Sequence, residues 1–63
     1  MAGFDYGDAE RFFWDYMAGN IQARGRATSY QDAAETYIEA RGLPQSVFPE
    51  LVLYFDDIDS GDD

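Results

Sequence analysis

The segment SYQDAAETYIEARG, which begins at Ser29, constrains the fold more than any other part of the chain. Apolar residues recur in it every three or four positions, which is the spacing of an amphipathic helix. These residues are Tyr30, Ala33, Ala34, Tyr37 and Ile38. Ser29 with Asp32 makes a variant capping box at the start, and Arg41-Gly42 makes a typical helix end. A helix over residues 30 to 41 is therefore predicted.

A second helical pattern occupies residues 8 to 24. At 100° per residue its apolar stripe contains Ala9, Phe13, Tyr16, Met17, Asn20 and Ile21. Asp8 is the predicted N-cap, and Arg24-Gly25 is the predicted end. Gly19 lies inside the pattern and costs about 1 kcal/mol relative to alanine, so we expect a break or kink there.

The stretch from Pro44 to Ile58 has two interpretations. As a helix with Pro49 in its first turn, it gathers five apolar side chains on one face. They are Val47, Phe48, Leu51, Phe55 and Ile58. As a strand, residues 51 to 55 would give an α+β fold instead, but a lone strand needs a partner edge, and the only other candidate, GFDYG, is short. We favour one all-α domain over residues 1 to 63, a small three-helix bundle with an acidic C-terminal end.

Composition excludes several kinds of chemistry. Histidine and cysteine are absent, so disulfides, the usual zinc ligands and the common nucleophile–base pairs are missing. A bundle of 63 residues also has little room for a catalytic pocket. The acidic run after Asp56 lacks the spacing of an EF-hand, because Gly61 comes one residue too early. We therefore expect no enzymatic activity, no cofactor and no metal.

Thirteen acidic residues oppose four arginines, for a formal net charge of −9. Acidic chains can be disordered, but disordered chains are poor in aromatics, which make up 17% of this one. The charge disfavours direct binding to nucleic acid or to an anionic membrane, and no apolar run is long enough to span a membrane. The N-terminal segment also lacks the pattern of a signal peptide. We expect a cytoplasmic protein, monomeric or weakly dimeric, with a basic partner.

Carboxylates gather on the predicted polar faces. Asp32, Glu35 and Glu39 lie opposite the apolar stripe of their helix, at successive turns. The acids of the third segment that we expect to bind a partner are Glu50, Asp56, Asp57 and Asp59. A solvated face normally mixes both signs of charge, whereas these faces carry one sign. Leu53, among the acids, and Trp14, on the first helix, are candidate apolar contacts, although Trp14 could simply widen the core. Residues 60 to 63 are expected to form a loose tail.

A short motif pattern runs through residues 33 to 56. Its positions are Ala33, Tyr37, Ile38, Glu39, Tyr54, Phe55 and Asp56. On these positions the chain resembles a segment of ArdA-type antirestriction proteins, in which a helix with an alanine and a Y-[IV]-E motif is followed by a glycine turn and a Y-F-D element. After Asp56 the chain departs from that family, whose members are also longer. In size and charge it is similar to small acidic phage-encoded anti-CRISPR proteins.

These resemblances imply DNA mimicry by carboxylates. We expect an inhibitor that blocks the basic DNA-binding surface of a host defence protein in a bacterial cell, with a CRISPR effector complex as the first choice and a restriction-modification enzyme as the alternative. An interpretation of another class also fits the composition: a small acidic structural or regulatory interaction protein unrelated to DNA, for example one adapted to high salt.

Overall fold

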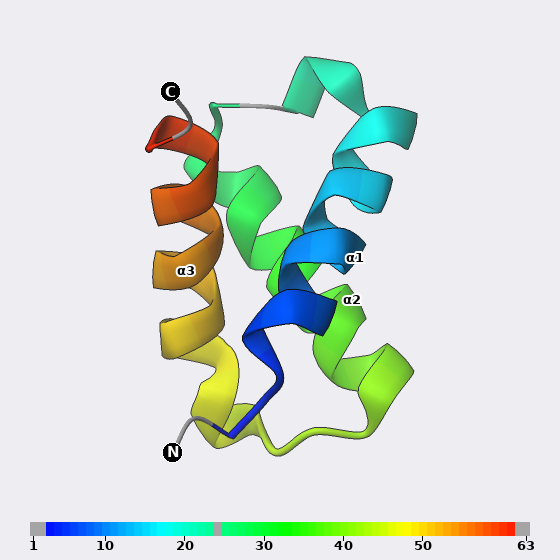
Figure 1. Cartoon of the computed structure of the whole chain (residues 1–63), viewed down its shortest axis with the longest axis vertical. Coiled ribbons are helices and arrows are strands. Elements are labelled where there is room, and N and C mark those ends of the chain that lie inside the picture. Colours follow the sequence, from blue (N-terminus) through cyan, green and yellow to red (C-terminus); the bar gives the residue numbers. More distant parts are fainter. Residues whose placement is uncertain (1–2, 24, 62–63) are drawn as a thin grey trace.

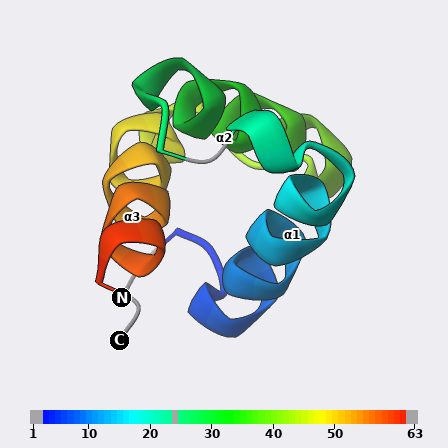
Figure 2. The same cartoon turned by 90° about the horizontal axis from the view of Figure 1, so that it is seen from above.

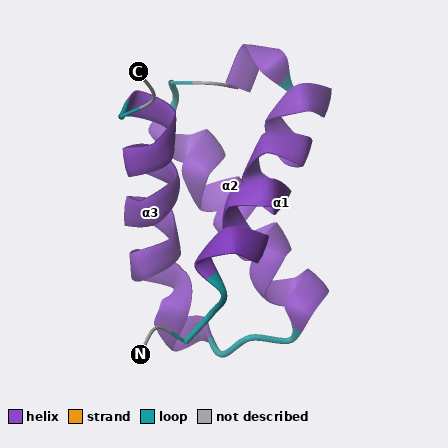
Figure 3. Cartoon of the chain, in the orientation of Figure 1, coloured by secondary structure: helices purple, strands orange, loops and turns teal. Residues whose placement is uncertain are grey.

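Three antiparallel α-helices form the chain, as seen in a computed structural model that describes residues 3–23 and 25–61. They are α1 (Tyr6–Gly19), α2 (Ala27–Arg41) and α3 (Phe48–Ser60), with short 3-10 helices η1 (Ile21–Ala23) and η2 (Gln45–Val47) in the connections. The chain runs up α1, down α2 and up α3 (Figure 1). Across the described ranges there is no strand (Figure 3). The predicted all-α three-helix bundle is therefore confirmed, and the alternative strand is wrong.

The start of α1 differs from the prediction. Asp5, not Asp8, is the N-cap, because its Oδ1 accepts hydrogen bonds from the backbone N–H groups of Gly7 at 2.9 Å and Asp8 at 3.3 Å. Both aspartates have the right chemistry for a cap, and the sequence pattern did not distinguish them. The earlier start places Asp8 in the first turn of the helix, where its carboxylate is available for a contact with another helix.

The end of α1 follows the expected break at Gly19. The helix ends at that residue, and a 3-10 turn over 21–23 replaces the helical continuation that was predicted to reach residue 24. As a consequence, two members of the predicted apolar stripe are not in the core. Asn20 is exposed, and Ile21 is 75% exposed. Residue 24 lies outside the described residues, so the predicted helix-ending role of Arg24 is not addressed.

The bounds of α2 match the prediction at one end only. The C-cap is Gly42 in the left-handed region, with φ of 66°, as expected from Arg41-Gly42. At the other end the helix begins at Ala27, after an Arg26 N-cap that makes no side-chain capping bond. Ser29 is thus inside the first turn and buried, so the predicted capping box with Asp32 does not form.

The third helix extends slightly further than expected. Pro49 lies in its first turn, where the missing N–H costs no intrahelical bond. The helix continues through Ser60 and ends at Gly61, whose N–H donates to the Asp57 carbonyl at 2.7 Å. The segment predicted as a loose tail therefore begins in helix, while residues 62–63 lie outside the described part of the chain.

The core fills the space between the three helices, whose arrangement Figure 2 shows from above. Its largest fully buried side chains are Tyr37, Phe13, Phe55, Met17 and Leu51. Phe13 of α1 stacks on Phe55 of α3 with ring centroids 4.9 Å apart. On α2, Ala33 and Ala34 are fully buried, and their small side chains leave room for these rings. This packing turns the opposite side of α2, with its acids, to solvent.

Candidate binding surface

The acids predicted on α2 form an exposed row. Asp32, Glu35 and Glu39 all lie on the solvent side, opposite the buried stripe that contains Ala33 and Tyr37. With a rise of about 1.5 Å per residue, they follow one another at about 4.5 Å and 6 Å along the helix axis. Across residues 3–23 and 25–61, no hydrogen bond or ion pair engages these three carboxylates. They are charges held at fixed positions on a helix and are available to a partner.

A second group of acids surrounds Leu53 on α3. Glu50, Asp56 and Asp57 are exposed, and Leu53 is 69% exposed between them. At 100° per residue, Leu53 lies almost opposite the buried Leu51 and Phe55. A rotation of the helix that buried Leu53 would therefore expose both of them. A single exposed leucine is common on protein surfaces, and it is the position of Leu53 among three carboxylates that makes it the candidate apolar contact.

Two tyrosines link this α3 surface to the start of α1. The Tyr6 hydroxyl donates to Glu50 Oε2 at 2.8 Å, and the Tyr54 hydroxyl donates to the Tyr6 carbonyl at 3.2 Å. Their rings lie 4.9 Å apart. The pKa of Tyr6 is raised mainly by its hydrogen bond to Glu50. The pKa of Tyr54 is raised by burial, and further by the nearby charges of Glu10 and Asp57. This aromatic contribution was not predicted from the sequence.

Asp59 differs from the other acids predicted to bind a partner. It is half-buried, and its Oδ2 accepts hydrogen bonds from the Tyr30 hydroxyl at 2.6 Å and the Gly25 N–H at 3.1 Å. Burial, and then the hydrogen bond to Asp59, raise the pKa of Tyr30 to about 12. Asp59 thus joins the end of α3 to the start of α2. Because its Oδ2 already accepts these hydrogen bonds, Asp59 is less available to a binding partner than the exposed acids.

A similar contact at the opposite end of α2 was not predicted from the sequence. Asp8 Oδ2 accepts from the Tyr37 hydroxyl at 2.7 Å and from Arg41 Nε at 2.7 Å, while Oδ1 accepts from Arg41 Nη2 at 3.2 Å. The Arg41 guanidinium also lies over the rings of Phe12 and Tyr37, at 5.6 Å and 5.2 Å. Arg41 lies in the last turn of α2, where a cation suits the helix dipole, but its main contacts join α2 to α1.

The charges at this contact shift one another's pKa values. Hydrogen bonds from Arg41 and then from Tyr37 lower the pKa of Asp8, and the bond to Asp8 raises the pKa of Arg41. Burial, followed by the bond to Asp8, raises the pKa of Tyr37 to about 12. The sequence contained an indication of the contact between Asp8 and Arg41. Antiparallel α1 and α2 bring an acidic first turn and a basic last turn to the same end of the bundle.

Trp14 extends the core more than it forms a separate contact site. It is half-buried, and its ring lies edge-on to the neighbouring Phe13 ring, with centroids 5.1 Å apart. The predicted apolar contacts therefore differ: Leu53 is exposed among acids, whereas Trp14 packs against buried residues. Of the two, Leu53 remains the candidate contact.

The described residues were compared with two further kinds of site, a cluster of metal ligands and a membrane-spanning helix. Within 3–23 and 25–61, no three acidic side chains converge into a cluster that could hold a metal ion. None of the helices in the same ranges is long and apolar enough to cross a membrane. Comparison with known proteins gives no match to any family model, to any curated protein or to any solved structure.

Proposed function

We propose that this protein is a DNA-mimic inhibitor, which binds the basic DNA channel of a host CRISPR effector complex in the bacterial cytoplasm and keeps DNA out. The observation that carries the proposal is the row of Asp32, Glu35 and Glu39 on α2, exposed and without a partner among the described residues. The acids around Leu53 on α3 add a second charged surface with an apolar centre.

Spacing and rigidity favour a mimic of the phosphate backbone. The α2 carboxylates follow one another at about 4.5 Å and 6 Å along the axis, close to the range of one to two phosphate steps of about 3.4 Å in one DNA strand. A folded polyanion loses less conformational entropy on binding than a flexible acidic tail, because its charges are already in place. A basic channel that has evolved to bind DNA should therefore accept it.

Like-charge repulsion supports the same proposal. Asp32 and Glu35 are three residues apart, and Glu35 and Glu39 are four apart, so each pair destabilises α2 by about 0.2–0.5 kcal/mol. A domain of this size has only a few kcal/mol of stability, so such an arrangement is costly. Retaining it is consistent with a role in binding a basic partner, which would remove the repulsion in the complex.

The decisive experiment measures DNA binding by a purified CRISPR effector in the presence of this protein. The parent protein should block DNA binding, and the triple variant Asp32→Asn, Glu35→Gln, Glu39→Gln should lose the effect while keeping its helical circular dichroism. The logarithm of the affinity for the effector should fall linearly with the logarithm of salt concentration, and the triple variant should reduce that slope by about three if each carboxylate meets one basic group.

The control is Asp15→Asn, which removes one exposed charge from α1, away from both candidate surfaces. It should leave inhibition unchanged, whereas Asp32→Asn should lower the salt slope by about one. A restriction-modification enzyme is tested in parallel. Inhibition of that enzyme alone would replace the proposed target but retain mimicry. Binding to a partner that does not depend on salt would reject mimicry and favour an acidic interaction protein unrelated to DNA.

A further inference from the structure

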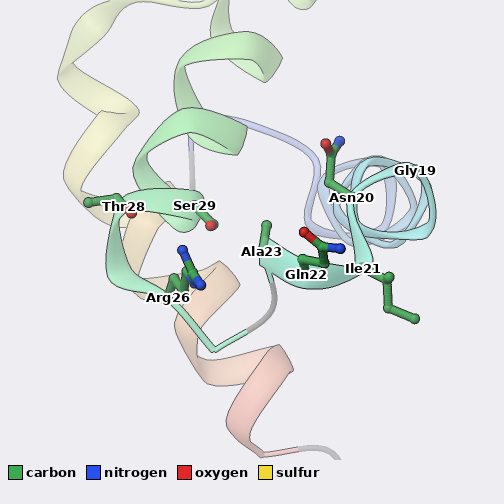
Figure 4. A pocket seen from close by; sticks show the side chains of 8 residues that line it. All are labelled: Gly19, Asn20, Ile21, Gln22, Ala23, Arg26, Thr28 and Ser29. Carbon is green, nitrogen blue, oxygen red and sulfur yellow. The ribbon is translucent and has the colours of Figure 1, made fainter.

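A polar cavity of about 420 Å³ lies between the end of α1 and the start of α2 (Figure 4). Asn20, Ile21 and Gln22 line one side, and Arg26, Thr28 and Ser29 line the other. Its volume falls within the range of small-molecule sites, about 300–1,000 Å³. None of the described residues that line it is acidic, although the chain carries a net charge of −9. The local charge of the cavity is therefore opposite to that of the whole protein.

Arg26 supplies that charge. Its guanidinium points into the space between η1 and the start of α2 (Figure 4). Among the residues that the structure describes, no carboxylate forms an ion pair with it. The neighbouring Asp59 accepts hydrogen bonds from Gly25 and Tyr30 and does not line the cavity. Arg26 thus presents the planar set of donors that binds a phosphate group well.

Ser29 gives an independent indication of a ligand. It is only 8% exposed and lines the cavity, with its hydroxyl turned toward the interior in Figure 4. No hydrogen bond from the described part of the chain engages that hydroxyl. The oxygen itself still touches solvent, since no buried side-chain N or O atom of the described residues lacks a hydrogen-bond partner, so water or a ligand completes its hydrogen bonds. Its accessible side is the cavity, so the missing partner would lie there.

The start of α2 adds backbone donors at the same place. No side chain caps it, and its first turn contains no acid. The N–H groups of Ala27 and Thr28 precede the first helical bonds, since the earliest donors bonded to the Arg26 carbonyl are Ser29 and Tyr30. N–H groups without a partner among the described residues, at the positive end of a 15-residue helix, favour an anion.

We propose that this cavity binds a phosphomonoester. The phosphate would accept hydrogen bonds from Arg26, from the hydroxyl of Ser29 and from the first N–H groups of α2. A water molecule occupies about 30 Å³ in the liquid, and a phosphate group is only a few times larger. The cavity of about 420 Å³ therefore has room for more than one phosphate. The organic part of the ligand would lie against the side-chain amides of Asn20 and Gln22, since the Ile21 side chain points away from the cavity (Figure 4). This site is separate from the acidic surfaces and does not rest on DNA mimicry.

The test is a titration of the isolated full chain at constant ionic strength, followed by amide NMR shifts and calorimetry. Inorganic phosphate is the first probe and adenosine monophosphate is the second. Saturable shifts should centre on residues 26 to 30, and the ester should bind more tightly than inorganic phosphate. Arg26→Gln should weaken binding by about tenfold or more, as expected for loss of a bond between charged groups.

Arg11→Gln is the matched control. Arg11 is also exposed, it lies on α1, and its loss changes the net charge by the same amount, so binding should be unaffected. Ser29→Ala should weaken binding by about two- to tenfold. If that buried variant does not fold, Arg26→Gln still decides the question, because Arg26 is exposed. Equal losses in the two arginine variants, or no saturable binding, would overturn the site. Equal affinity for phosphate and its ester would overturn the ester assignment.

Discussion

The carboxylates of this bundle perform two different kinds of work. Asp8 and Asp59 each accept a hydrogen bond from a buried tyrosine of α2, at opposite ends of that helix. Asp32, Glu35 and Glu39, on the other side of the same helix, meet only solvent in the described structure. The two inner carboxylates join helices, whereas the three outer ones weaken the helix that carries them. The hydrogen bonds of the inner carboxylates thus distinguish acids that stabilise the fold from exposed acids that are available to bind a partner.

The inner contacts are built in a parallel way. Tyr30 and Tyr37 are seven residues apart, two turns along one face of α2, and both rings are buried in the core. Each hydroxyl reaches the edge of the core and donates to an aspartate, Asp59 of α3 for Tyr30 and Asp8 of α1 for Tyr37. Two tyrosines thus add hydrogen bonds from α2 to both other helices, beside the apolar contacts of a small core.

The largest effect that tests this comparison comes from alkaline pH, which acts on both inner contacts together. Tyr30 and Tyr37 ionise with a pKa of about 12 in the fold, against 10.0 for an unperturbed tyrosine. A raised folded pKa means that the contribution is complete below pH 10 and is lost as pH rises toward 12. The free energy of unfolding, measured by urea denaturation, should therefore decrease across this window.

The sequence contains no lysine, so no lysine titrates between pH 10 and 12 and contributes to the measured change in stability. The remaining groups that titrate in this window are the other tyrosines. The variant Tyr30→Phe, Tyr37→Phe is the control, and its stability should depend much less on pH between 10 and 12. A parent protein whose stability stays constant across this window would show that the two hydroxyl contacts contribute little. The distinction between inner and outer carboxylates would then lose its energetic basis.

Single substitutions at the inner contacts should have a smaller effect. Tyr30→Phe and Tyr37→Phe each keep the buried ring and remove one hydrogen bond to a carboxylate, at a cost of about 1.5–3 kcal/mol, the range for bonds to charged groups. At about 4–8 °C per kcal/mol for a domain of this size, Tm should fall by roughly 6 °C or more. Thermal melts at neutral pH test this, with Tyr16→Phe as control, because no hydrogen bond of the described residues uses the half-buried Tyr16 hydroxyl.

Sequence periodicity was sufficient to predict most of the architecture. All five residues of the predicted α2 stripe are buried, and Gly42 ends the helix in the left-handed conformation. The period of 3.6 residues and the glycine requirement are local properties, so they can be read from adjacent residues. The same reasoning located the break at Gly19 and the helical state of the third segment.

Roles that depend on distant residues could not be predicted in this way. Asp59 resembled the other acids in sequence, but its partner Tyr30 lies 29 positions away. Asp8 and its partner Tyr37 are separated by the same number. Whether an aspartate meets a tyrosine or solvent depends on how the helices pack, and neither charge nor spacing along one helix contains that information. Ile21 was misplaced for a related reason, since the helix ended before reaching it.

The smallest effects should come from the outer row, with the opposite sign. Glu35 repels both Asp32 and Glu39, so Glu35→Gln should stabilise the fold by removing two unfavourable pairs of about 0.2–0.5 kcal/mol each. Glu39→Gln removes one pair and a negative charge near the C-terminal end of α2, where it opposes the helix dipole. Asp32→Asn removes one pair near the start of the helix, where a negative charge is favourable, so its net effect should be close to zero.

Salt separates this electrostatic explanation from a change in packing. The Debye length falls from about 10 Å at 0.1 M to about 3 Å at 1 M, and neighbouring acids of the row are about 4.5–6 Å apart along the axis. The stabilisation from Glu35→Gln should therefore shrink as salt rises, because the repulsion it removes is already screened in the parent. Denaturation at both salt concentrations measures it. If neutralising the outer row lowers stability as the tyrosine variants do, those carboxylates also maintain the fold, and the two groups of acids are not distinct.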